Sequence, residues 1–181
     1  MIINICLLIV VVLTGMILIS YNHFIRKNNR VKETESQIDV LLNQRFDLIP
    51  NIVECVKGYT KHESDTLENL TKLRSSYDRD GFSIENTEAI DKNFHHVIML
   101  SEAYPDLKAN TQFLSLQDNL RRIEDKLMIA RMSYNMAVTS YNNLVESVPS
   151  NIVAKLFAFE QKELFHLEDA KRANIQVDLS N

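Results

Sequence analysis

The residues best suited to chemistry in this sequence lie between Gln44 and Glu63. This stretch contains a carboxylate (Asp47), a thiol (Cys55) and an imidazole (His62), which are side chains that a cysteine hydrolase can combine. The same residues also fit the solvent-facing side of a helix. The choice between a hydrolase site and a polar helix surface depends on the elements that carry these residues.

Two other pairs have the residue types of metal sites but not the arrangement. His95 and His96 are adjacent, and neighbouring side chains on a helix point about 100° apart, so one metal ion cannot easily take both. Glu163 and His166 have the Glu-x-x-His spacing of di-metal bundles, but those sites need a second such motif and two further glutamates. The chain has no H-E-x-x-H or C-x-x-C motif, and its 3 Gly cannot build a phosphate loop. The sequence therefore predicts no catalytic, cofactor-binding or metal-binding residues, and no cofactor.

The composition predicts an all-α fold. Only 3 Gly and 3 Pro occur in 181 residues, which leaves little material for turns and favours few, long elements. No segment shows strand-like alternation with turn signals on both sides. The formal net charge of -4 gives no basic surplus to attract nucleic acid.

Residues 1–25 predict a transmembrane anchor. They contain no Asp, Glu, Lys or Arg, and the run from Ile2 to Ile19 is almost purely aliphatic. A helix of about 20 such residues crosses a ~30 Å hydrocarbon layer. A cleaved signal peptide is the rival interpretation. It requires a basic segment before the apolar run and a small-residue cleavage site after it, and the sequence shows neither.

The charges beside the span predict its orientation. Arg26, Lys27, Arg30 and Lys32 follow it directly, whereas only the α-amino group precedes it. Because positively charged flanks stay on the cytoplasmic side, we expect a single-pass protein of the cell membrane. Its short N-terminus lies outside and the rest of the chain in the cytoplasm.

An unbroken 3.5-residue apolar repeat predicts one long helix over about 110–147. Asn110 can cap its start with its side-chain oxygen, and Pro149 stops it because proline disfavours helical geometry in the residue before it. The repeat is typical of the seam of a coiled coil or a left-handed helical bundle. Its positions are Phe113, Leu116, Leu120, Ile123, Leu127, Ala130, Tyr134, Ala137, Tyr141, Leu144 and Val148.

A seam of this length needs a partner, and the segment directly after the span supplies one. Pro50 should kink this second helix, because it removes one backbone bond and crowds the carbonyl of Phe46. Gly58 can end it. In this arrangement Cys55 is an apolar filler rather than a reactive thiol. The apolar positions that should face inward are Val31, Ile38, Leu42, Ile49, Ile52, Val56 and Tyr59.

Arg45 is a polar residue on the apolar side of this second helix. A buried guanidinium needs a carboxylate or several carbonyls, and Asp118, Glu124 and Asp125 on the long helix are candidates by position. We hypothesise that Arg45 is a structural pin that fixes the register of the two helices. In the alternative, its side chain extends to the bundle surface.

Two shorter helices fit between the long ones. The first is expected over about 62–79, with Asp65 and Glu68 in capping-box spacing. The second is expected over about 84–102 and can be capped by Ser83. Its inward residues should be Ile90, Phe94 and Val97.

The segment after Pro149 predicts a short amphipathic helix that Ser150 can cap. This helix either closes the end of the bundle or binds the membrane surface or a partner. The sequence thus divides into an anchor (1–25), a helical bundle (26–148), a short amphipathic helix (149–170) and a flexible tail (171–181).

Several strings in this order carry a family resemblance. They are SQIDV at 36–40, RFDLIPNIVECVKGYTKHE at 45–63, YPDLKAN at 104–110, SLQDNL at 115–120, YNMAV and YNNLVES within 134–147, and PSNIVAKLFAFE at 149–160. Together with the N-terminal anchor, they resemble the LemA family over nearly the whole chain. The resemblance implies a bacterial single-pass membrane protein with an up-and-down helical bundle on the inner side. It implies no catalytic activity and no set of catalytic residues.

We therefore expect an all-α protein in which a transmembrane helix continues into an antiparallel bundle of three to four long helices. Two long helices with few breaks favour rigidity over catalysis, since active sites usually need a pocket and irregular backbone. The expected function is a non-enzymatic membrane-anchored scaffold or adaptor. Its partners would be the lipid bilayer and an unidentified protein, without nucleic acid, and homo-oligomers are compatible with this role. The alternative is an accessory subunit of a membrane enzyme, such as a zinc peptidase, or of a transporter.

Overall fold

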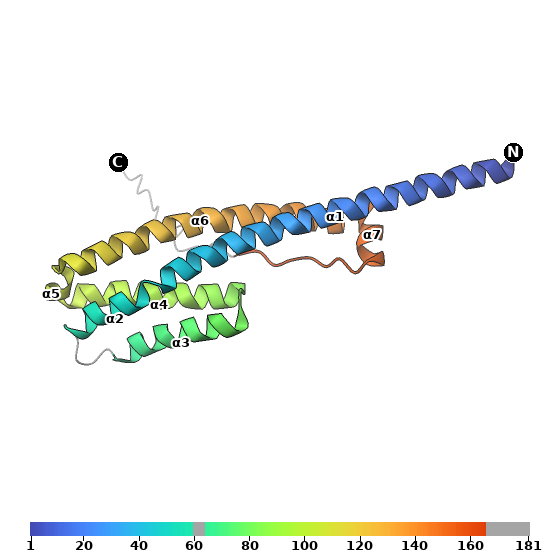
Figure 1. Cartoon of the computed structure of the whole chain (residues 1–181). Helices are drawn as coiled ribbons and strands as arrows, with labels where there is room; N and C mark the ends of the chain where they lie inside the picture. The colour runs from blue at the N-terminus through green and yellow to red at the C-terminus, as the bar shows by residue number, and fades with distance from the viewer. Residues whose placement is uncertain (60–63, 166–181) are drawn as a thin grey trace, which may run out of the picture.

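The computed structural model describes residues 1–59 and 64–165. The described chain is all-α, with seven helices and no strand (Figure 1). The helices are α1 (Ile2–Phe46), α2 (Ile49–Lys57), α3 (Ser64–Asp80), α4 (Ile84–Ala103), α5 (Pro105–Lys108), α6 (Thr111–Glu146) and α7 (Ser150–Leu156).

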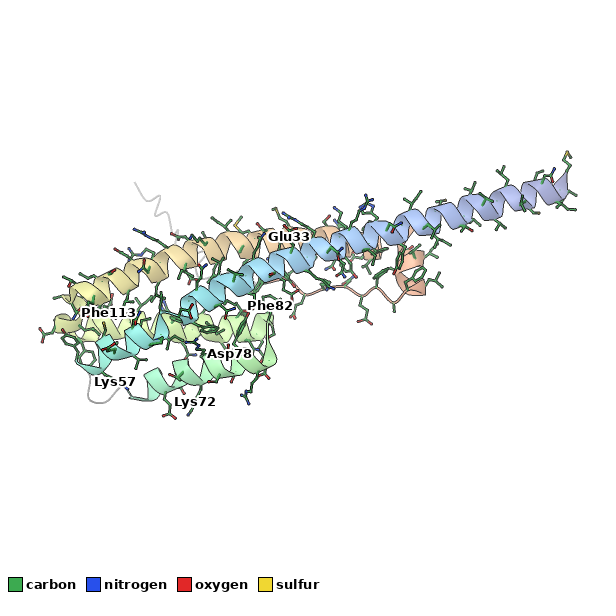
Figure 2. All side chains as sticks on the ribbon, viewed as in Figure 1. Glu33, Lys57, Lys72, Asp78, Phe82 and Phe113 are labelled. Carbon is green, nitrogen blue, oxygen red and sulfur yellow. The ribbon has the colours of Figure 1, made fainter. Side chains whose placement is uncertain are left out.

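Helix α1 has two halves with different surroundings. Its N-terminal half extends beyond the other helices, and its aliphatic side chains are exposed (Figure 2). Its C-terminal half packs along α6 and buries Phe24, Val31, Ile38 and Leu42. Among the described residues, this is the one helix that is long and apolar enough to cross a membrane, by length and composition. In the described part of the chain, most aliphatic side chains between Ile2 and Ile19 are left exposed.

The expected kink at Pro50 is a break between two helices. Helix α1 ends at Phe46, and α2 begins at Ile49 with Pro50 in its first turn. Proline fits there because a first-turn N–H would have no helical acceptor. Gly58 is the C-terminal cap of α2, as predicted, with an ordinary right-handed backbone at φ -70°.

Helix α6 follows the predicted seam closely. Asn110 caps it by accepting from the backbone N–H groups of Gln112 and Phe113, at 2.8 and 3.1 Å. Most seam residues from Phe113 to Tyr141 are buried, but Val148 at the end of the repeat is 79% exposed. The repeat therefore predicts the packed length of α6 and fails at Val148, two residues after the helix ends.

Helices α3 and α4 form a hairpin beside α1 and α6. Gly81 turns the chain at φ 72°, where a Cβ would be strained. Ser83 caps α4 as predicted, accepting from the N–H of Asn86 at 3.0 Å. The hydroxyl of Tyr77 in α3 donates a hydrogen bond to the carboxylate of Asp39 in α1. Burial of the tyrosine, and to a smaller extent the nearby Asp39 carboxylate, raises its pKa.

Two residues that were predicted to have roles in this hairpin have side chains that the structure does not describe. These are the Asp65 end of the proposed capping box and Val97 of α4. Glu68, the other capping-box residue, is exposed and pairs with Lys72 at 2.7 Å. Ile90 and Phe94 are buried as expected.

Helix α7 ends much earlier than the predicted 149–170 segment. Its last residue is Leu156, and Ala158 adopts a left-handed backbone at φ 54°. The N–H of Phe159 then bonds the carbonyl of Ala154 at 2.9 Å, as in a Schellman turn. Residues 159–165, which we name the C-terminal arm, run back along the bundle without helical structure (Figure 1).

The helix start also differs from the prediction. The cap position of α7 is Pro149, and Ser150 is the first helical residue. The Ser150 hydroxyl instead donates back to the carbonyls of Leu144 and Ser147, at 2.7 and 2.9 Å. The predicted flexible tail at 171–181 lies outside the described residues.

Candidate functional site

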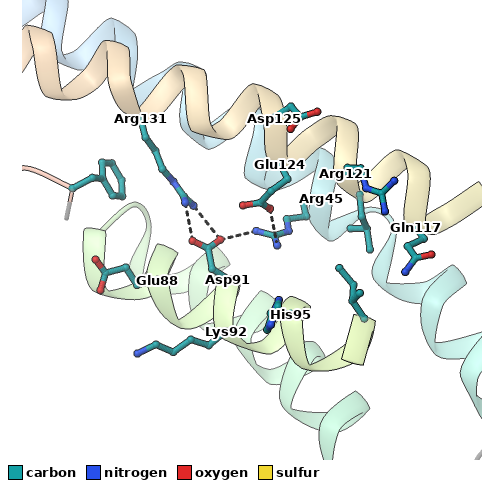
Figure 3. Close-up of a pocket in the computed structure, with 13 residues that line it drawn as sticks. Arg45, Glu88, Asp91, Lys92, His95, Gln117, Arg121, Glu124, Asp125 and Arg131 are labelled. Carbon is teal, nitrogen blue, oxygen red and sulfur yellow. Dashed lines mark hydrogen bonds and ion pairs between the residues drawn. The ribbon is translucent and has the colours of Figure 1, made fainter. Parts of the chain in front are cut away.

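Arg45 lies at the centre of a charged cluster between α1, α4 and α6 (Figure 3). It sits in the last turn of α1, just before the break that Pro50 requires. Its side chain is 5% exposed, and its guanidinium pairs with Asp91 at 2.6 Å and with Glu124 at 3.0 Å. Arg45 is therefore buried and paired with carboxylates, as the pin hypothesis requires, and the alternative that it extends to the surface is wrong.

The partners of Arg45 are only partly those expected. Glu124 is one of the three predicted carboxylates, whereas Asp118 and Asp125 form no ion pair with the guanidinium. Asp91 of α4 was not anticipated. It directly follows the buried Ile90, so its place beside an inward residue of α4 is the signal in the sequence that could have identified it.

A second arginine completes the cluster. Arg131 of α6 holds the other oxygen of Asp91 at 2.8 Å, so this single carboxylate joins two guanidinium groups (Figure 3). Each arginine also lies against an aromatic ring: Arg45 is 4.2 Å from the centroid of Phe94, and Arg131 is 5.5 Å from that of Phe165. Ring faces attract cations and shield them from water, so the cluster ties α1, α4, α6 and the arm together.

A cavity of about 470 Å³ lies beside this cluster. Its charged lining is balanced, because the acidic side chains equal the lysines and arginines in number and His95 adds an imidazole. Among the described residues that line it there is no cysteine, serine or threonine that could act as a nucleophile. The ion pairs of the cluster join α1, α4 and α6. The charged lining consists of Arg45, Lys92, Arg121, Arg131, Glu88, Asp91, Glu124 and Asp125.

The residues of the hydrolase hypothesis do not form a described site. Cys55 borders a polar groove of about 500 Å³ between α2 and the start of α6. Burial, and then the charge of Glu54, raises the pKa of its thiol, which is opposite to the shift that activates a cysteine. Asp47 instead faces Arg74 at 3.7 Å, and His62 lies outside the described residues.

The expected inward face of this stretch is largely correct. Ile49, Ile52 and Val56 are buried. Tyr59 is the exception: it is 40% exposed, and its hydroxyl accepts a hydrogen bond from the Asn110 side chain at 2.9 Å. The exposed polar residues Asp47, Asn51, Glu54 and Lys57 therefore belong to the outside of α2 and to the turn that precedes it.

The structure describes one member of each of the two residue pairs considered as metal ligands in the sequence. His95 is exposed at the edge of the charged cavity, and Glu163 lies in the arm. The side chain of His96 and the whole of His166 lie outside the description. Within the described residues, no group of three or more His, Cys, Asp or Glu is placed to hold a metal ion.

The arm is held to α6 by two asparagine side chains that sequence reasoning missed. Asn142 donates to the carbonyl of Lys162 at 2.8 Å and accepts from its N–H at 2.9 Å. Asn135 makes the same pair of bonds with Phe165, both at 2.9 Å. Seven helical residues rise ~10.5 Å, and three extended residues span ~10 Å, so the two asparagines match the arm in length.

Four exposed apolar residues lie on one side of the middle of α6. Met128, Ile129, Met132 and Met136 are all exposed, and their spacing places them within an arc of about 100°. Ile129 shares a shallow groove with Val40 of α1, which is also exposed. We name these five residues the methionine face. Contiguous apolar surface of this kind marks sites of interaction, and methionine side chains adapt to varied partners.

Comparison with known proteins supports the resemblance seen in the sequence. The profile of the LemA family matches residues 34–179, a range that includes the charged cluster and the arm. The protein named Protein LemA from Metamycoplasma hominis is 26% identical over 160 residues, which is 86% of this chain and 73% of that protein. The family match covers most of the chain. This chain therefore belongs to the LemA family.

Proposed function

We propose that this protein is a non-enzymatic scaffold or adaptor, anchored in the cell membrane by the N-terminal half of α1. The observation that carries the proposal is the continuity of α1, which is one helix from Ile2 to Phe46. Within the described residues, most aliphatic side chains from Ile2 to Ile19 are exposed, and the other half of the helix is a core element of the bundle. Such a helix would join the membrane and the bundle without a flexible linker.

The methionine face supports the adaptor part of the proposal. It lies on the longest helix of the bundle proper, on the side opposite the buried seam. A membrane-anchored bundle would present this face to proteins in or near the bilayer. The basic residues that follow the span favour a cytoplasmic bundle, because positive flanks are retained inside.

The anchor is tested by alkaline carbonate extraction and intact mass. A retained anchor leaves the full 181-residue chain in the membrane pellet. A signal peptide would be removed, which gives a shorter chain that carbonate releases. This second result would overturn the proposal.

The orientation is tested with one introduced thiol. In a Cys6→Ser/Cys55→Ser background, Asp80→Cys places a single exposed cysteine at the turn between α3 and α4. An impermeant maleimide should label it only after the cells are lysed. Labelling in intact cells would place the bundle outside.

The adaptor function is tested by photocrosslinking in the native membrane. A photoreactive residue at Met132 on the methionine face should give crosslinks, and the matched probe at Met99 on α4, which is similarly exposed, should not. Several partners or self-crosslinks favour a scaffold. One stoichiometric membrane enzyme or transporter favours the alternative, an accessory subunit. Equal crosslinking at both positions would contradict a specific docking face.

A further inference from the structure

Helix α7 exposes apolar side chains that the bundle does not use. Val153 and Ala154 are buried against the rest of the bundle. Ile152 and Leu156, which lie one turn apart on another side of the helix, are 67% and 66% exposed, and Phe157 is 45% exposed. Closing the bundle therefore accounts for only one side of α7.

The position of α7 along α1 indicates what lies next to this exposed side. The ring of Phe157 is 4.8 Å from that of Tyr21, and the ring of Phe159 stacks on Phe24 at 4.6 Å. Tyr21 comes two residues after Ile19, the end of the aliphatic run. These contacts place α7 at the level where the proposed span leaves the hydrocarbon layer, beside the emerging α1 (Figure 1).

The charges and aromatic rings at this level suit a lipid surface. Arg26 and Lys27 follow on α1, and the next arginine, Arg30, pairs with Glu33, the first acidic residue of the chain, at 2.7 Å. Lys155 is exposed on α7 between the apolar residues. Basic residues close to a membrane are attracted to anionic lipids, and tyrosine and phenylalanine rings favour the boundary between headgroups and acyl chains.

The geometry points to α7 as a second membrane contact, with Ile152, Leu156 and Phe157 inserted into the surface of an anionic bilayer beside the span. This inference rests on the proposed anchoring of α1 and adds a second attachment to it. One helix that crosses a bilayer leaves the bundle free to rotate about the membrane normal and to tilt. A second contact on one side of α1 sets which face of the bundle points toward the membrane.

The absence of tryptophan from the sequence makes a direct test possible. Leu156→Trp in the full chain introduces one fluorophore on the exposed side of α7. The protein is reconstituted into vesicles of phosphatidylcholine and phosphatidylglycerol whose acyl chains carry bromine at a shallow or a deep position. We expect blue-shifted emission and at least twofold stronger quenching by the shallow than by the deep bromines. Ile152→Trp on the same side should behave alike, and it serves if the first variant does not fold.

Two matched variants separate this inference from the proposed anchor. Met136→Trp carries an equally exposed residue on the methionine face and should not be quenched. Ile9→Trp lies in the middle of the aliphatic run and should be quenched most by the deep bromines.

The inference is overturned if Leu156→Trp and Ile152→Trp match Met136→Trp while Ile9→Trp is quenched, and in that case the anchor stands. It is also overturned if the emission of both α7 variants is blue-shifted without quenching, because a second protein copy then covers α7. An unquenched Ile9→Trp would remove the anchor and the inference together.

Discussion

Helix α6 holds one segment by side-chain packing and another by hydrogen bonds. With α1 it forms an apolar seam in which Leu127, Tyr134 and Tyr141 are buried. With the arm it forms hydrogen bonds from side chain to backbone. The side-chain amides of Asn135 and Asn142 bond the backbone groups of Phe165 and Lys162. The same seven-residue spacing serves both contacts, because two turns of a helix return a side chain to nearly the same direction.

The two kinds of contact depend on different residues. Packing in the seam depends on the shape of side chains from both helices, so a change on either side is felt. The arm is recognised through its backbone, which every residue except proline provides in full. We therefore expect the arm to depend more on the two asparagines of α6 than on the side chain of Lys162, whose ammonium lies 5.7 Å from the centre of the Tyr141 ring. Phe165 is the exception, since its buried ring packs on Tyr134.

The largest effect is expected in the seam. Leu127→Ala removes a fully buried side chain and should lower the free energy of unfolding by about 4 kcal/mol, because it combines lost burial with a cavity. Urea unfolding in detergent, followed by circular dichroism, measures this loss. Leu114→Ala on the exposed side of α6 is the matched control and should change stability by less than about 0.5 kcal/mol. Equal losses would show that the seam is not the main contact of α6.

The next effect is expected at the charged cluster, where α4 is joined to both α1 and α6. Arg45→Met should cost about 2 kcal/mol, because it removes one of the two guanidinium partners of Asp91 and the contact of the Arg45 guanidinium with the Phe94 ring. The melting temperature should fall, and Arg121→Met at the exposed edge of the same cavity should leave it nearly unchanged. An unchanged melting temperature for Arg45→Met would rule out Arg45 as a pin.

A smaller effect is expected at the arm. Asn142→Ala removes two hydrogen bonds, each worth about 1 kcal/mol, so it should release the arm and leave the seam intact. Hydrogen exchange at the amides of Lys162 and Phe165 should become fast, while amides in the middle of α6 stay protected. Asn143→Ala, one residue along α6 and exposed, is the control. If Lys162→Ala loosens the arm as much as Asn142→Ala, recognition through the backbone is wrong.

The smallest effect is expected where α7 gives way to the arm. Ala158→Gly should stabilise the protein by about 1 kcal/mol, because glycine adopts the left-handed backbone without strain. Ala109→Gly is a matched control: its backbone is right-handed at φ -85°, so glycine offers no relief there. Thermal unfolding should show a rise for the first variant alone, and a fall for both would exclude strain at Ala158.

The sequence predicted what local rules determine. The apolar repeat identified the seam of α6, and the caps at Asn110 and Ser83 follow from the bonding capacity of their side chains. The sequence raised the burial of Arg45 as a hypothesis, because Arg45 and Glu35 are the two polar positions in the apolar register of this helix. These features depend on a residue and its neighbours within a few turns.

The features that the sequence did not predict depend on contacts between residues far apart in the chain, or on a helix that ends without the usual signal. The pairing of Arg45 with Asp91 joins residues of α1 and α4, and no periodicity relates the two positions. The end of α7 was missed because Ala158 takes a left-handed backbone that usually signals itself with glycine. The arm was missed because its hydrogen bonds come from side chains of α6 and not from a neighbouring strand.

The unbroken course of α1 has a mechanical consequence. From Tyr21 to Arg45 the helix is about 36 Å long, and it is not interrupted by a break at which it could bend. When a bilayer becomes thinner than the aliphatic run, a spanning helix responds by tilting. A tilt of about 10° at the membrane would displace the Arg45 end of the helix sideways by about 6 Å. In the proposed arrangement, α1 is thus a lever that converts a change in membrane thickness into a displacement of the bundle.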